Sequence, residues 1–171
     1  MRAPQVVIVE TDGRIARLLA ELAADGRWLL RGARAAAAGP LVRDRRPSVL
    51  VVQVAPADDD PSALELIADA GRRFPDVPVV AVSDAKLNDA DRTAWTAALF
   101  DLGARYALFP PLTKPVLEDV VSGLMGAAAR RAGAPAAPAP VPAAPPKPKP
   151  RPKKRAPADE VIDLADDELH E

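Results

Sequence analysis

The sequence contains no cysteine and only one histidine, His170. The missing cysteines exclude disulfides, thiolate metal sites and thiol nucleophiles, and the position of His170 excludes Ser-His-Asp chemistry in a folded domain that ends before it. No apolar run approaches the roughly 20 residues that span a bilayer. The first residues lead directly into an apolar run and do not resemble a signal peptide. We therefore expect a cytoplasmic protein with no membrane span, and we expect no cofactor.

Proline divides the chain into two parts. Ten of the 20 prolines follow Gly133, whereas the preceding part is rich in Val, Leu, Ala and Arg. A domain of about 130 residues buries roughly two thirds of the surface that its unfolded chain exposes, which is enough for an ordinary core. We predict a folded domain over residues 1–131, a disordered Ala/Pro-rich and then basic linker over 132–158, and an acidic-apolar peptide motif over 159–171.

Short apolar runs alternate with helical patterns throughout the predicted domain. Apolar residues at i, i+3, i+4 and i+7 from Ile15 predict the first helix, which Asp12 can cap. The second helix is expected over 35–44, with an interruption near Gly39-Pro40. This alternation predicts an α/β fold with a doubly wound, five-stranded parallel sheet in the order 2-1-3-4-5. The strands are expected at residues 5–9, 28–30, 48–54, 79–82 and 106–109.

Start and stop signals place the later helices. Pro61-Ser62 begins one helix, and the capping-box spacing of Asn88 and Asp91 begins the next, which Gly103 ends. The side chains expected to point inward from these helices and from the last one are Leu64, Ile67, Ala68, Trp95, Leu99, Leu102, Leu117, Val120, Val121 and Leu124.

Four segments carry a resemblance to a known family. They are VVIVE at the first strand end, PSVLVVQ at the third, PVVAVS at the fourth and GARYALFPPL around the fifth. In this order and spacing, residues 5–131 resemble the receiver domain of bacterial response regulators. The resemblance implies the flavodoxin-like fold and an output by docking to partner proteins.

The same resemblance implies five positions for phosphoryl chemistry, and most of them have changed. Glu10 keeps one carboxylate of the acidic pair that would hold Mg²⁺, but Thr11 stands beside it. Gln53 occupies the phosphoacceptor position, where its uncharged amide is a poor nucleophile. Ser83 keeps the hydroxyl of the fourth strand, whereas Pro110 replaces the lysine. We predict a pseudo-receiver that takes up no phosphoryl group and has no catalytic or metal-binding residue.

Two alternatives to this prediction remain open. Lys114 would serve as the phosphate-binding lysine if the loop before the last helix were shifted in register. Asp58, Asp59 and Asp60 could supply metal ligands, although adjacent acids beside a proline are also typical of a solvated turn at a helix start.

The family resemblance also implies a docking surface on the fifth strand and the last helix. In this sequence that surface includes Tyr106, Lys114, Glu118 and Asp119, and association with a second copy of the chain is left open.

The tail offers two further binding elements. The basic run Lys147–Arg155 carries six cations and no aromatic residue, so it is either a solubilising linker or a nonspecific contact for nucleic acid. Val161, Ile162, Leu164 and Leu169 lie among seven carboxylates. This terminal segment would dock as a short helix or add as an edge strand, where it resembles a SUMO-interacting motif, or it is simply a disordered end.

These observations predict a non-enzymatic adaptor or scaffold in bacterial signalling or cell organisation, which binds partner proteins through the domain surface and the C-terminal motif. The alternative is a nucleic-acid-associated regulator that uses the basic run. An enzyme is not expected, because the predicted domain has no Gly-rich phosphate loop, cysteine or histidine.

Overall fold

Five short, mainly apolar runs form one parallel sheet in the computed structural model, which describes residues 3–43, 47–56 and 61–133. The strand order is β2-β1-β3-β4-β5, so β3 lies at the centre and β2 and β5 are the edges. The predicted fold class and strand order are confirmed. The strands are β1 Gln5–Val9, β2 Leu29–Gly32, β3 Ser48–Gln53, β4 Val79–Val82 and β5 Tyr106–Leu108.

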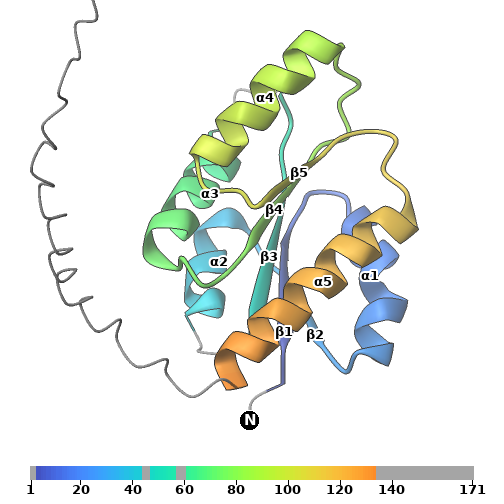
Figure 1. Ribbon diagram of the computed structural model, residues 1–171, viewed down its shortest axis with the longest axis vertical. Helices are drawn as coiled ribbons and strands as arrows, with labels where there is room; N and C mark the ends of the chain where they lie inside the picture. Colours follow the sequence, from blue (N-terminus) through green and yellow to red (C-terminus); the bar gives the residue numbers. More distant parts are fainter. Residues whose placement is uncertain (1–2, 44–46, 57–60, 134–171) are drawn as a thin grey trace, which may run out of the picture. The chain divides into compact units, whose positions relative to one another are not determined.

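Five helices cover the two faces of the sheet. Figure 1 shows α1 and α5 together on one face and α2, α3 and α4 on the other. This doubly wound arrangement follows from the right-handed crossovers that connect parallel strands. The helices are α1 Arg14–Asp25, α2 Ala35–Val42, α3 Ser62–Arg73, α4 Asp89–Asp101 and α5 Lys114–Gly133.

The core consists of two layers, because successive side chains of a strand point to opposite faces. Leu50 and Val52 of β3 pack toward α2, α3 and α4, together with Leu99. Val49 and Val51 pack toward α1 and α5. Most inward positions predicted for α3, α4 and α5 are buried or partly buried against these two layers.

Several details differ from the sequence prediction. Strands β3 and β5 each end one residue earlier than predicted, at Gln53 and Leu108. Strand β2 begins at Leu29 and continues to Gly32, because its pairing with β1 runs from Gln5↔Leu29 to Ile8↔Gly32. On α3 the fully buried partner of Ile67 is Ala70, whereas Ala68 is only partly buried. The predicted interruption of α2 is also wrong.

Helix α2 continues through Pro40. A proline inside a helix removes the one hydrogen bond that its own N–H would make. The helix is retained because Ala38 and Val42 are buried against the sheet, and Arg43 N donates to the Gly39 carbonyl oxygen over 3.1 Å past the proline.

The described residues lie within one compact unit, Met1–Ala136. None of the helices described in this unit has the length and apolar character needed to cross a membrane. The first two residues of the predicted linker, 132 and 133, belong to α5. Other predictions made above fall outside the described residues, namely those for Asp58–Asp60, the linker from residue 134, the basic run Lys147–Arg155 and the terminal motif with Val161, Ile162, Leu164 and Leu169.

Candidate functional site

The carboxyl ends of β1, β3 and β4 meet at one edge of the sheet, which is where open α/β sheets bind ligands. The register pairs Val9 with Val52 and Gln53 with Val82, so the residues that follow these strands are neighbours. The structure therefore brings together Thr11, Gln53 and Ser83, three of the positions predicted from the receiver resemblance.

A chain of polar contacts joins these strand ends. The amide oxygen of Gln53 accepts hydrogen bonds from Thr11 N at 2.9 Å and from Thr11 Oγ1 at 3.2 Å. Gln53 Nε2 donates to Asp84 Oδ2 at 3.3 Å. The other carboxylate oxygen of Asp84 forms an ion pair with Arg14, at the start of α1. We call these four residues, Thr11, Gln53, Asp84 and Arg14, the strand-end network.

The ion pair of the strand-end network contributes little to the stability of the fold. The Arg14 and Asp84 side chains are 44% and 39% exposed, and ion pairs this accessible contribute roughly 0–1 kcal/mol. The contacts nevertheless connect β1, β3, α1 and the loop between β4 and α4. Both functional groups of the Gln53 amide are occupied by side chains or backbone of the chain itself.

Glu10 is engaged in capping a helix. Its Oε2 accepts from Ile15 N at 2.6 Å and its Oε1 accepts from Ala16 N at 3.0 Å. These donors belong to the first turn of α1, whose N–H groups have no partner within the helix. The N-cap residue is Gly13 and not the predicted Asp12, although Asp12 Oδ1 accepts from Arg14 N, in the first residue of α1, at 3.0 Å. The carboxylate retained from the receiver pattern therefore has a structural role.

Ser83 and Pro110 complete the five predicted positions. Ser83 is 1% exposed, and its Oγ accepts a hydrogen bond from Ala85 N at 3.2 Å. The hydroxyl therefore stabilises the turn that follows β4. Pro110 follows β5 and carries neither a charge nor a hydrogen-bond donor on its side chain. A lysine at that position would supply an ammonium group, which proline does not replace.

These side chains do not fit the Mg²⁺ that receiver domains are expected to hold. A hard divalent cation takes six oxygen ligands, usually with one or two carboxylates among them. Both Glu10 oxygens accept backbone N–H groups, and Gln53 contributes a neutral oxygen that already accepts two hydrogen bonds. Among the described residues, no three His, Asp or Glu side chains are grouped as metal ligands.

Lys114 lies apart from the strand-end network. Its ammonium group pairs with Glu21 of α1 and lies 3.9 Å from Glu118 Oε1. The hydrogen bond and charge of Lys114 lower the pKa of Glu21 from its ordinary value of 4.5, and the same hydrogen bond raises the pKa of Lys114 above 10.5. This geometry argues against the register shift that would place Lys114 in a phosphate-binding role.

We expect Lys114→Met to return the pKa of Glu21 to about 4.5, as measured by NMR titration of the Glu21 carboxyl carbon. A carboxylate with a lowered pKa stabilises the fold above pH 4.5, and this contribution is lost as pH falls through the lowered pKa. For Lys114 the contribution is present below pH 10.5 and is lost as pH rises through the raised pKa. Lys86→Met is the control, and a Glu21 pKa unchanged by Lys114→Met would contradict the pairing.

The predicted docking residues are only partly grouped. Tyr106 is 42% exposed on the edge strand β5, and Asp119 is exposed on α5. Glu118 and Lys114 instead lie together beside α1. The prediction also missed two exposed apolar side chains, Phe100 on α4 (49%) and Val116 on α5 (45%). Phe100 lines a hollow with Ala107 and Phe109, whereas Tyr106 alternates to the opposite face of β5. We use the name β5 surface for the exposed residues on β5 and its neighbouring helices, Phe100, Tyr106, Val116 and Asp119.

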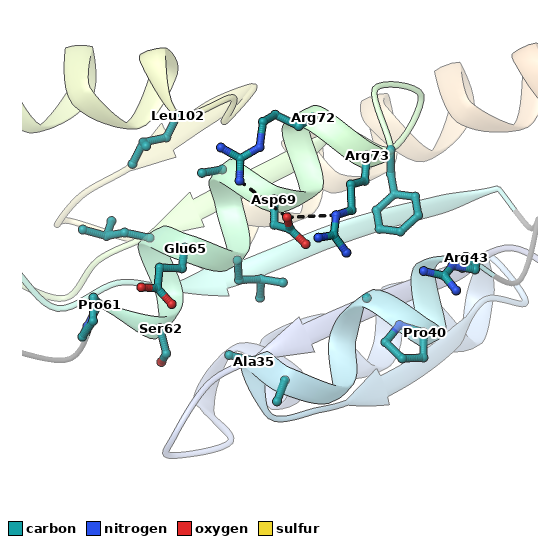
Figure 2. A pocket seen from close by; sticks show the side chains of 16 residues that line it. Ala35, Pro40, Arg43, Pro61, Ser62, Glu65, Asp69, Arg72, Arg73 and Leu102 are labelled. Carbon is teal, nitrogen blue, oxygen red and sulfur yellow. Dashed lines mark ion pairs between the residues drawn. The ribbon is translucent and has the colours of Figure 1, made fainter.

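A groove of about 940 Å³ lies between α2 and α3 (Figure 2), and no residue of the strand-end network lines it. Small side chains such as Ala35 and Pro40 line the α2 side. On the α3 side, Arg72 and Arg73 pair with Asp69 at 3.5 and 3.0 Å. None of the five predicted phosphoryl-site positions lines this groove.

Arg14 and Asp84 were not identified from the sequence. Asp84 directly follows Ser83, so its place at the same edge could have been inferred from the parallel sheet. The pairing with Arg14, 70 positions away, has no sequence pattern, because it depends on how α1 packs beside the strand ends.

Neither a protein-family model nor a curated protein matches the sequence. Solved structures do match it. NtrX from Brucella abortus is similar over 76% of this chain, with 19% identity and a TM-score of 0.59, and the chain spans 28% of the length of NtrX. The receiver domain of NtrX alone is 20% identical over 71% of this chain and 98% of that domain, with a TM-score of 0.57.

A third solved structure extends this similarity to another protein. The signal receiver domain of a putative LuxO repressor protein from Vibrio parahaemolyticus is 16% identical over 74% of this chain and 93% of that chain, with a TM-score of 0.59. At these identities the similarity shows the fold. The chain therefore has the fold of response-regulator receiver domains, and the predicted resemblance is confirmed at this level.

Proposed function

We propose that this protein is a receiver-like adaptor of bacterial two-component signalling or cell organisation that takes up no phosphoryl group and acts by binding other proteins. The observation that carries the proposal is the strand-end network, in which Gln53 is hydrogen-bonded to Thr11 and Asp84.

The proposed lack of phosphoryl transfer follows from the chemistry of Gln53. Forming an acyl phosphate requires a carboxylate oxygen that attacks phosphorus, with a cation to neutralise the phosphoryl oxygens. The Gln53 amide oxygen is a poor nucleophile and is directed toward two Thr11 donors. The carboxylate that contacts Gln53, that of Asp84, is held by Arg14 and Gln53. No residue in the network thus combines a free carboxylate with a bound cation.

Incubation of the full chain with Mg²⁺ and acetyl phosphate should leave its intact mass unchanged. A receiver domain that retains all five residue types, treated in parallel, should gain one phosphoryl group. An acid-labile phosphate on this protein would overturn the proposal, and peptide mapping would then identify the acceptor residue. Beryllofluoride with Mg²⁺ should likewise cause no chemical-shift changes around Gln53.

The β5 surface is proposed as the protein-docking site of the domain. A hollow of about 570 Å³ lies between α4 and β5 and is lined by Phe100, Ala97 and Phe109, among others. Phe100 is exposed beside this hollow, and exposed aromatic side chains next to a concavity are typical of interface anchors. Lys114 and Glu118, also predicted for docking, would contribute only if a partner extended toward α1.

Replacing Tyr106 and Asp119 by lysine should abolish partner recovery in quantitative pulldowns from a bacterial extract, while the melting temperature remains unchanged. Both side chains are exposed, so the substitutions remove interface contacts without opening a cavity. Leu29→Lys, on the opposite edge strand, is the control and should keep its partners. Equal recovery by all variants would place the docking site elsewhere.

The tail supports an alternative function as a nucleic-acid-associated regulator. Six cations in Lys147–Arg155 would release counterions on contacting phosphates, with a slope of log K against log salt near −5. Deleting this run should remove that salt dependence.

The terminal motif at 159–171 remains a proposed second protein-binding element. Truncation at Gly133 tests it in the pulldown described above for Tyr106 and Asp119.

A further inference from the structure

A third hollow lies at the amino ends of β4 and β5, at the opposite end of the strands from the strand-end network. It has a volume of about 510 Å³ and is formed by the loops that lead into β4 and β5 together with one stripe of α5. Arg72, Arg105 and Arg131 line it, with Asp101 as the one acidic side chain in the lining. We call it the arginine pocket.

Two of its three arginines have no ion-pair partner among the described residues. Arg105 and Arg131 form no ion pair with any residue that the structure describes, and Arg72 makes one pair with Asp69 at 3.5 Å. Arg72 and Arg131 belong to the last turns of α3 and α5. Basic residues are favourable there because of the helix dipole. The guanidinium donors of Arg131 remain available to an external anion, whereas Arg72 shares its guanidinium with Asp69 in the groove of Figure 2.

The floor of the arginine pocket is apolar. Leu124, Ala127 and Ala128 are spaced with Arg131 at i, i+3, i+4 and i+7, so one stripe of α5 faces the pocket. The loop before β4 adds its own apolar side chains, from Pro75, Val77 and Pro78. A ligand for this pocket would therefore combine negative charge with an apolar group.

We infer that the arginine pocket binds an acidic peptide segment of a partner protein, with carboxylates paired to the arginines and an apolar side chain against the floor. Planar guanidinium groups bind carboxylates through two parallel hydrogen bonds. A nucleic acid fits less well, because no aromatic side chain lines the pocket for base stacking. The inference is independent of the proposed loss of phosphoryl transfer, which the acetyl phosphate experiment tests separately.

The test is a fluorescence-anisotropy titration of the full chain with a labelled peptide of repeated Glu-Leu-Glu. The pocket variant carries Arg105→Glu and Arg131→Glu. The control carries Arg34→Glu and Lys86→Glu, which change the net charge equally at exposed positions outside the pocket. Losing two charge-assisted contacts should weaken binding about tenfold or more in the pocket variant, and binding by the control should stay within about twofold.

Two further probes complete the design. A peptide with Gln in place of every Glu should bind about tenfold more weakly than the acidic peptide. A labelled single-stranded oligonucleotide should bind more weakly than the acidic peptide and should fail to displace it. The inference is overturned if the acidic peptide does not bind, if both double variants bind it equally, or if the oligonucleotide displaces it. Melting temperatures show whether each variant is folded.

Discussion

Gly103→Ala should lower the free energy of unfolding by about 2–4 kcal/mol. The alanine side chain would be strained at a positive φ and would overpack against its neighbours. Gly103 has φ of +110°, a conformation that residues with a side chain rarely adopt. A methyl group there would also lie 3.1 Å from the Cα of Gly71 on α3. The two glycines allow α3 and the loop before β5 to touch backbone to backbone.

Urea denaturation followed by circular dichroism would measure this effect. Gly123→Ala is the matched control, because Gly123 lies on α5 without a positive φ and its added methyl group would meet no atom within 4 Å. The control should be stabilised by about 0.5–1 kcal/mol, since alanine is the better helix former. A similar free energy change in both variants would contradict the close approach of Gly71 and Gly103.

Leu50→Ala should lower the free energy of unfolding by about 3–5 kcal/mol, the upper part of the range for buried leucines. Leu50 is fully buried on the central strand, where it is paired with Val7 of β1 and Val79 of β4. Neighbours on both sides limit the collapse of the cavity that the substitution creates, so little of the lost packing can be recovered.

Leu29→Ala provides the matched comparison for Leu50→Ala. Leu29 lies on the edge strand β2 and is 38% exposed, so the same chemical change should cost about 1 kcal/mol or less. Urea denaturation should show a lower midpoint for Leu50→Ala with an unchanged slope. Equal midpoints for the two variants would contradict the central position of β3.

Periodicity in the sequence was sufficient to predict most of the fold. Strand β4 has the predicted bounds, and Asn88 caps α4 by accepting from Asp91 N at 2.9 Å. The predictions failed where tertiary contacts outweigh local preference. The bounds of β2 differ from the prediction because its pairing with β1 fixes its ends. Helix α2 continues through Pro40 because burial of its inner face stabilises it.

The sequence predicts where the candidate site lies, but it does not predict which side chains contact each other there. Parallel strands place Gln53 and Ser83 at one edge, and this follows from the sequence pattern alone. The ion pair between Arg14 and Asp84 depends on the packing of α1 and on side-chain direction, which no spacing rule provides. No spacing rule predicts the capping of α1 by Glu10 either, because it depends on the turn at Gly13, which has φ of +70°.

The strand-end network has a consequence for how the proposed adaptor would be controlled in a cell. The ends of β1 and β3 and the loop after β4 are joined by the side chains of the chain itself, so the domain needs no added ligand to assemble this edge. Its partner complex would then follow mass action, with occupancy set by protein concentration and Kd. When the partner is in excess, a change in copy number should change the amount of complex about in proportion. Synthesis and degradation would thus provide the regulation that a phosphoryl group provides elsewhere.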